Sequence, residues 1–257
     1  MNTEKRFAVL IDSDNIASKY IPIVLDEISK EGIATYKRIY GDWTTQNSVQ
    51  WKKALLEYSI TPMQQYSYTQ GKNSTDSAMI IDAMDILYSG KVDGYCLVSS
   101  DSDFTHLAAR LREEGMAVIG MGEKKTPRPF IAACNQFKYL DLLYTSSQNE
   151  KKQNEKTKPI KEGKDYPERE AQNELDSIIS AIRNIINESS DDDGWLYLAQ
   201  LGSILVKRRP DFDVRNYGFS KMTPFLASLD TVEIKKIPQA DNVSQIFVRN
   251  VKKRRRN

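Results

Sequence analysis

Two aspartates stand one residue apart in the segment CLVSSDSDFTHL, which begins as an apolar strand and ends as a helix. Asp101 and Asp103 therefore follow a buried strand, and Asp12, with Asn15 close behind it, ends a second apolar run, RFAVLID. Carboxylates within a few ångströms repel one another, so at least one takes up a proton unless a cation neutralises the group. Oxygen ligands without His or Cys nearby favour magnesium or manganese over zinc.

Such an ion polarises a phosphoryl oxygen and lowers the pKa of a bound water, which is the chemistry of phosphodiester hydrolysis. The chain has a single histidine, His106, on an expected helix. A lone helical histidine is more often packed or exposed than catalytic. Catalysis based on histidine is therefore disfavoured, and a metal-activated water is the better hypothesis.

The elements that must position these carboxylates alternate between strand-like and helix-like patterns over residues 1–146. The strand-like segments are 6–12, 33–40, 60–66, 94–100 and 116–122, and the main helical segments after the first are 48–58, 74–90 and 104–115. A short helix near 129–135 and an apolar stretch through Tyr139 and Leu143 follow. This alternation predicts an α/β fold, a three-layer α/β/α sandwich with a mainly parallel sheet.

Ligands of an open parallel sheet bind beyond the carboxyl ends of the strands, where the strand order reverses. In the order 3-2-1-4-5, the first and fourth strands are neighbours, so Asp12, Asp101 and Asp103 converge at one rim. The helix at 74–90 adds Asp76, whose spacing from Ile80 places it on the apolar side of that helix. The predicted catalytic and metal-binding residues are Asp12, Asp76, Asp101 and Asp103.

Other polar residues are candidates for supporting roles, namely Asn15, Lys72, Ser100 and Asp82. Lys72 is placed to meet a phosphate, although an exposed loop lysine is the default interpretation. Ser99 and Ser100 either donate hydrogen bonds at the site or simply end the strand. The aspartates have a structural alternative as well, because Asp103 begins a helix and can act as its N-cap or first-turn charge. Asp85 is expected on the surface.

Four segments, VLIDSDNI, GKNSTDSAMIIDAMDIL, LVSSDSDFTHLAARLREEGMAVIGMG and TPRPFIAACNQFKYLDLL, together resemble an NYN domain, of the PIN-like group that includes bacterial DUF88 proteins. The similarity covers about residues 5–145. It implies a PIN-like sandwich and a magnesium-dependent ribonuclease site on the four aspartates, with Asn15 beside them. Relatives often have an aspartate in place of Asn135, and if that position holds metal in them, metal binding is weaker here. PIN-like domains often pair, so a homodimer is also expected.

Residues 147–171 have almost no apolar side chains and are expected to form a charged flexible linker. Beyond it, 172–250 has three helical patterns and two strand-like runs, which favours a small winged helix-turn-helix domain, and 251–257 is a basic tail. The segment GWLYLAQLGSILVKRRPDFDVRNYGFSKMTPFLASLDTVEIKK resembles an OST-HTH, or LOTUS, domain. That resemblance implies RNA as the partner.

The residues expected to bind RNA are Lys207, Arg208, Arg209, Arg215, Tyr217 and Lys221. The cations are placed to meet phosphates, while Tyr217 and Phe219 can stack on bases. In the competing interpretation, the cations form a solvated face and the two aromatic rings belong to the core. The basic tail adds affinity that weakens with salt, or acts as a solubilising end or localisation signal.

The leading hypothesis is a metal-dependent endoribonuclease, a hydrolase whose C-terminal domain recruits the RNA. A non-catalytic RNA-binding adaptor is the alternative. A phosphatase of the haloacid dehalogenase type is a third candidate, because LIDSDNI matches a hydrophobic run followed by Asp-x-Asp, although the NYN pattern fits the whole region better.

Composition restricts the cellular context. The formal net charge of +2 over 257 residues does not indicate a partner. No segment has ~18 uninterrupted apolar residues and no signal peptide is visible, which predicts a cytoplasmic protein without membrane spans. Cys96 and Cys134 stand in apolar surroundings and are expected to be packed thiols.

Overall fold

The computed structural model describes residues 4–44, 49–66, 74–153, 168–238 and 244–251. The chain divides into two compact units, Met1–Gln148 and Asn149–Asn257. Both ends of the expected linker are helical, because α6 (Leu140–Gln153) and α7 (Glu168–Ser189) extend into it. Lys72 and residues 252–257 of the basic tail lie outside the described residues.

The N-terminal unit is built on a six-stranded, fully parallel sheet with the order β3-β2-β1-β4-β5-β6. The strands are β1 (Arg6–Asp12), β2 (Ile33–Gly41), β3 (Thr61–Gln64), β4 (Gly94–Val98), β5 (Ala117–Gly122) and β6 (Gln136–Tyr139). The predicted order 3-2-1-4-5 is confirmed and is extended by one edge strand. β6 was not predicted, because its four residues, QFKY, carry too short a pattern to separate from the neighbouring helices.

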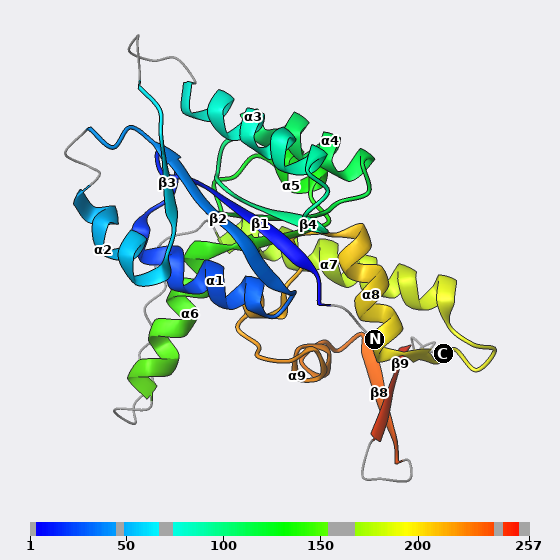
Figure 1. Cartoon of the computed structure of the whole chain (residues 1–257). Helices are drawn as coiled ribbons and strands as arrows, with labels where there is room; N and C mark the ends of the chain where they lie inside the picture. The colour runs from blue at the N-terminus through cyan, green and yellow to red at the C-terminus, as the bar shows by residue number, and fades with distance from the viewer. Residues whose placement is uncertain (1–3, 45–48, 67–73, 154–167, 239–243, 252–257) are drawn as a thin grey trace. The chain divides into compact units, whose positions relative to one another are not determined.

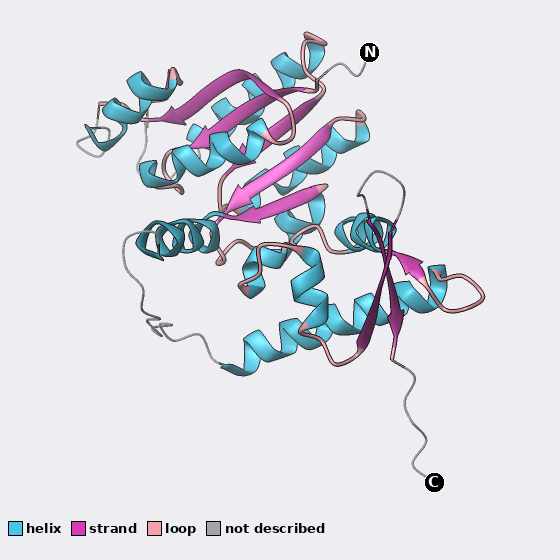
Figure 2. Ribbon diagram, turned by 90° about the horizontal axis from the view of Figure 1, so that it is seen from below, coloured by secondary structure: helices cyan, strands magenta, loops and turns pink. Residues whose placement is uncertain are grey.

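Helices cover both faces of this sheet and make the predicted three-layer α/β/α sandwich (Figures 1 and 2). One face is covered by α3 (Ser74–Tyr88), α4 (Thr105–Glu113) and α5 (Arg128–Ala133), and the other by α1 (Ile21–Ser29), α2 (Val49–Tyr58) and α6. β1 alternates between the two cores, with Ala8 and Leu10 on the α3 side and Val9 and Ile11 on the α1 side. Burial on both faces explains why this strand reads as a continuous apolar run.

The C-terminal unit combines three helices with a small antiparallel sheet. The helices are α7, α8 (Leu198–Arg208) and α9 (Met222–Ala227), and the strands β7 (Leu196–Tyr197), β8 (Val232–Pro238) and β9 (Ser244–Asn250) have the order β7-β9-β8. The predicted two-stranded wing therefore gains a third short strand. The apolar stripe of α7, including Ile178, Ile182 and Ile185, packs in the core of this unit.

The cysteines and the helices were also compared with the expectations from sequence. Both cysteines are buried and free, as packed thiols should be. Within the described ranges, no helix combines the length and apolar character needed to cross a bilayer.

Candidate active site at the carboxyl edge of the sheet

Asp12 is the buried centre of the candidate site. It is the last residue of β1, and its side chain has no exposed surface. The neighbouring strand β4 pairs Val98 with Ile11, so Ser99 comes next to Asp12. Ser99 Oγ donates to Asp12 Oδ2 at 2.7 Å, and Asn15 Nδ2 donates to the same oxygen at 2.8 Å. Burial raises the pKa of Asp12, and these hydrogen bonds partly offset that effect by stabilising the carboxylate.

The turn after β4 links the remaining aspartates to this centre. Ser99 Oγ accepts a hydrogen bond from the backbone N–H of Asp101 at 3.0 Å. The Asp101 carboxylate then accepts from the N–H of Asp103 at 2.9 Å and caps the 3₁₀ turn Ser102–Phe104. The capping role expected for Asp103 therefore belongs to Asp101, and Asp103 is a first-turn charge with an exposed side chain.

Asp76 lies in the first turn of α3 and is half-buried. Burial, together with the negative charges of four aspartates at or after the ends of β1 and β4, raises its pKa to about 6. Those aspartates are Asp12, Asp101, Asp103 and Asp14. Three segments far apart in the sequence thus place carboxylates within electrostatic reach of one another.

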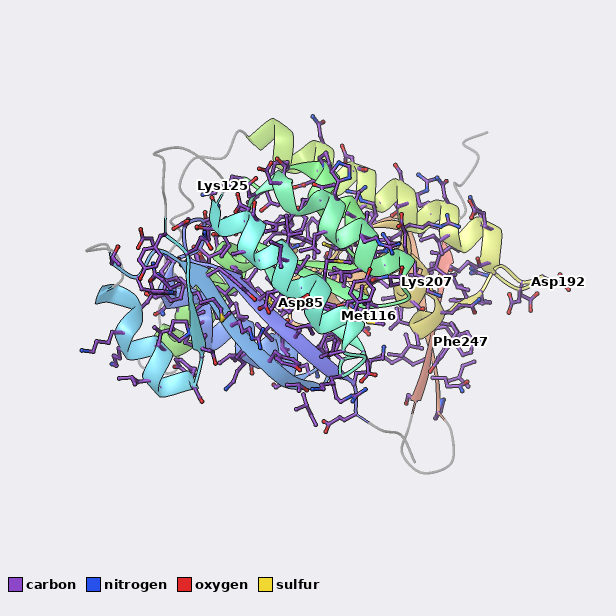
Figure 3. All side chains as sticks on the ribbon, turned by 45° about the horizontal axis from the view of Figure 1, so that its top comes forward. Asp85, Met116, Lys125, Asp192, Lys207 and Phe247 are labelled. Carbon is purple, nitrogen blue, oxygen red and sulfur yellow. The ribbon has the colours of Figure 1, made fainter. Side chains whose placement is uncertain are left out.

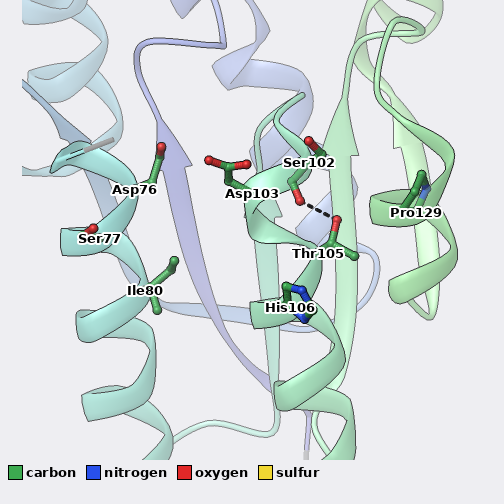
Figure 4. A pocket seen from close by; sticks show the side chains of 8 residues that line it. All are labelled: Asp76, Ser77, Ile80, Ser102, Asp103, Thr105, His106 and Pro129. Carbon is green, nitrogen blue, oxygen red and sulfur yellow. Dashed lines mark hydrogen bonds between the residues drawn. The ribbon is translucent and has the colours of Figure 1, made fainter. Parts of the chain in front are cut away.

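An open cleft of about 540 Å³ lies between α3 and the start of α4. Figure 4 shows Asp76, Ser77 and Ile80 on the α3 side and Asp103, Thr105 and His106 opposite. The carboxyl groups of Asp76 and Asp103 point toward the gap between the two elements. His106 lines the cleft and is exposed to solvent, as expected for a lone histidine on a helix surface.

Two predicted supporting residues have other partners. Arg38 and the Tyr40 hydroxyl of β2 both donate to the Asp82 carboxylate, which makes Asp82 part of a partly buried link between α3 and the sheet. Ser100 Oγ accepts from the backbone N–H of Glu123 and ties β4 to the end of β5. Asp85 is exposed, as expected.

Asn135 is remote from the aspartates. Its side-chain oxygen accepts from the N–H of Val118 at 2.8 Å, and its own N–H donates to the Val118 carbonyl. Val118 is the second residue of β5, and Asn135 precedes β6, so both lie at the amino edge of the sheet. Asn135 is therefore at the opposite edge of the sheet from the four aspartates.

Sequence reasoning missed two carboxylates at the carboxyl edge. Glu123 directly follows β5, where it accepts from the Tyr20 hydroxyl at 3.1 Å. Asp141 follows β6 and accepts from the N–H of Lys124 at 3.2 Å. The signal for Glu123 was available, since it is the first polar residue after a predicted strand. Asp141 could not be placed because β6 was not predicted.

The donor set matches the oxygen-only preference of magnesium and manganese, and the repulsion at Asp76 is what a cation would relieve. The oxygen donors and the negative charge of these aspartates thus suit a divalent cation. Among the described residues, however, no three His, Cys, Asp or Glu side chains lie close enough together to coordinate one.

In the C-terminal unit, most of the predicted RNA-binding side chains are engaged within the protein. Arg208 pairs with Glu188 and Arg215 with Asp213, each at 2.6 Å, while Arg209 donates to Ser177 Oγ at 2.8 Å. The ring of Tyr217, expected to stack on bases, packs against Phe212 and Phe225 in the core, and Phe219 also packs against Phe225. Lys207 and Lys221 are exposed (Figure 3 labels Lys207).

Comparison with family models agrees with this architecture. A crystal structure of a protein of unknown function from Vibrio parahaemolyticus aligns with 53% of this chain and 93% of its own, at 19% identity and a TM-score of 0.46. No curated protein matches the sequence significantly. Family models match an OST-HTH/LOTUS domain at residues 173–244 and an NYN domain at residues 6–141, more than half of the chain. The chain belongs to the NYN domain family and carries a C-terminal OST-HTH/LOTUS domain.

Proposed function

We propose that the N-terminal unit is a metal-dependent endoribonuclease and that the C-terminal unit holds its RNA. NYN domains are typically nucleases of the PIN-like group, and OST-HTH domains bind RNA. The observation that carries the proposal is the hydrogen-bonded link from Asp12 through Ser99 to Asp101, with Asp76 facing it from α3. Capping roles alone do not explain why Asp76 lies among like charges that raise its pKa.

Asp12, Asp76, Asp101 and Asp103 are the residues that would hold magnesium or manganese. When bound, such an ion supplies an activated water and a counter-charge for the phosphoryl oxygens. The protein's own contribution is positioning. Ser99 and Asn15 donate to one oxygen of Asp12, which holds this carboxylate in one orientation and favours its ionised form in a buried place.

The cleft beside these residues suits a segment of RNA. Its volume lies within the ~300–1,000 Å³ typical of ligand sites. The exposed His106 ring offers a donor for phosphate or ribose oxygens, while Ile80 offers an apolar contact. Since the cleft is open, a strand need not enter by its end, which favours internal cleavage.

An activity assay with a conservative variant tests the proposal. Asp101→Asn removes a charge but keeps a good N-cap, so the turn after β4 should persist. We expect wild-type protein to cleave single-stranded RNA in the presence of manganese and Asp101→Asn to lose at least ~100-fold, on the order of what positioned catalytic groups contribute. Asp85→Asn, an exposed change on α3, should cleave normally. Equal cleavage by wild type and Asp101→Asn would contradict the assignment.

A non-catalytic RNA-binding adaptor is the second candidate, and the structural roles of Asp12, which accepts from Ser99, and of Asp101, which caps a 3₁₀ turn, favour it. Calorimetric titration with manganese separates the two. An enzyme should bind the ion with heat that disappears in Asp101→Asn, whereas an adaptor should give the same weak signal in both proteins. RNA binding without cleavage across varied single-stranded substrates would support the adaptor.

A further inference from the structure

The small sheet of the C-terminal unit has two chemically different faces. Strand pairing places Leu196 beside Val248 and Val248 beside Ile234, and these side chains pack into the core. The alternate residues must point the other way. That outer surface, called the aromatic face below, consists of Trp195, Tyr197, Glu233, Lys235, Phe247 and Arg249.

The aromatic face carries three rings that do not belong to the core. Tyr197 is 41% exposed, and its ring lies 5.7 Å from that of Phe247, its cross-strand neighbour (Figure 3 labels Phe247). Trp195 is only partly covered. Leaving large rings accessible forfeits burial free energy, and exposed aromatic residues of this kind often mark a contact surface.

Two cations are set among these rings. The Arg249 guanidinium lies 4.5 Å from the centre of the Trp195 ring, and Lys235 Nζ lies 5.6 Å from it. Lys235 is also the cross-strand neighbour of Phe247. Arg249 is held by an ion pair with Glu233, so its position over Trp195 is supported from both sides.

The position of Trp195 is also fixed through its backbone. The N–H of Asp191 donates to the Trp195 carbonyl at 2.9 Å, and the N–H of Trp195 donates to the Asp191 carboxylate at 2.6 Å. Gly194, with φ of +82°, allows this tight turn, which other residues adopt only with strain. With its backbone fixed in this way and its ring beside Arg249, Trp195 needs little further ordering when a ligand stacks on it.

We propose that the aromatic face binds unpaired bases of single-stranded RNA by stacking, an inference that rests on the proposed RNA-binding role of this unit. Rings on a sheet with neighbouring cations suit an unpaired strand, because bases present π-faces while phosphates present negative charge. On the predicted helix surface, by contrast, the candidate stacking ring of Tyr217 packs against Phe212 and Phe225 of the core.

Fluorescence anisotropy with a labelled single-stranded RNA of about 12 nucleotides, within the range of known single-strand site sizes, tests this inference in EDTA, which prevents cleavage. The main variant combines Tyr197→Ser with Phe247→Thr. Tyr197 occupies the N-cap position of α8, where serine is favourable, and threonine suits a strand, so the fold should persist. One lost stacking contact weakens binding roughly 5- to 150-fold, so we expect at least a tenfold loss.

A matched control removes two exposed cations of the predicted helix surface, Lys207→Ala with Lys221→Ala. We expect a smaller loss, which shrinks as salt is raised, whereas the loss in the aromatic-face variant should persist at high salt. Duplex RNA should bind more weakly than the single strand, because its bases are not free to stack. Normal binding by the aromatic-face variant, with a large loss in the helix control, would overturn the inference and leave RNA binding intact.

A second readout does not depend on the main variant folding. Saturating single-stranded RNA should quench tryptophan emission in the wild type, and Trp195→Phe should abolish that quenching. RNA binding without Trp195-dependent quenching would also refute the aromatic face as the site. Failure of the wild-type protein to bind any RNA would instead overturn the proposed RNA-binding function, and this inference with it.

Discussion

Replacing Asp76 by asparagine should make the N-terminal unit more stable while removing its activity. Asp76 lies in the field of four other carboxylates, and burial together with that field raises its pKa to about 6. In the absence of a cation, the ionised side chain therefore destabilises the folded state at neutral pH. An asparagine at this position would keep the size and polarity of the side chain without the charge, so the repulsion disappears together with one expected metal ligand.

The magnitude follows from the change in pKa. A rise from the ordinary value of 3.8 to about 6 corresponds to about 3 kcal/mol at about 1.36 kcal/mol per pKa unit. Asp76 is only half-buried, so solvent and salt reduce this to roughly 1–2 kcal/mol. The first turn of α3 favours a negative charge by about 0.3–1 kcal/mol, and this is lost as well. We expect a net gain of about 1 kcal/mol at about pH 8, where the side chain is fully ionised.

The gain should depend on pH in one direction. Because the pKa of Asp76 is higher in the folded state, the folded state binds more protons than the unfolded state between about pH 4 and pH 6. The free energy of unfolding of the wild type therefore falls as the pH rises through this window. Asp76→Asn lacks this titration, so its advantage should be present above about pH 6 and should vanish near pH 4.

Urea denaturation in EDTA, followed by tryptophan fluorescence, measures the difference. A Trp195→Phe background in every protein leaves Trp43 and Trp51 as reporters of the N-terminal unit. Asp85→Asn on the exposed side of α3 is the control and should show no comparable pH-dependent gain. If Asp76→Asn is less stable than the wild type at about pH 8, or if its advantage persists unchanged near pH 4, the carboxylates do not share one field.

Three further predictions concern one residue of the site and two contacts at the amino edge of the sheet. Ser99→Ala leaves the buried carboxylate of Asp12 without one donor and should lower the free energy of unfolding by about 1–3 kcal/mol, measured by the same denaturation. Asn135→Ala should lower stability by about 1 kcal/mol and leave manganese binding unchanged by calorimetry, because Asn135 lies at the amino edge; a changed manganese affinity would contradict that placement. Arg6→Gln should raise the pKa of Asp93 from about 2 toward its ordinary range, followed by NMR titration; the stabilisation from this pair is present above about pH 4 and is lost as the pH falls toward about 2.

Much of the N-terminal fold could be predicted because its signals are local. β1, β4 and β5 are buried on both faces and read as apolar runs, while α3 carries a cap-like start and ends before a glycine. The carboxyl end of each strand is then known, and parallel strands bring their ends to one edge. Asp12, Asp101 and Asp103 follow from this rule without coordinates.

The hydrogen-bond partners of these aspartates could not be predicted. Ser99 and Ser100 are adjacent serines at the end of one strand, and only the pairing of β4 with β1 on one side and β5 on the other decides their partners. Ser99 contacts Asp12, whereas Ser100 contacts the backbone of Glu123. Asp82 lies on the same helix as Asp76, yet it binds Arg38 and the Tyr40 hydroxyl of β2.

In the C-terminal unit and in the chain as a whole, local features could likewise be predicted, whereas contacts between distant segments could not. Sequence alone predicted most strands and helices, the two domain families and four aspartates of the candidate site, because periodicity and strand ends are properties of neighbouring residues. Tertiary structure decided that Tyr217 packs against the core while Tyr197 and Phe247 share the outer face of the small sheet, and that Asn135 lies far from the aspartates. Those outcomes depend on register between strands distant in sequence, where a shift of one residue turns every side chain to the opposite face.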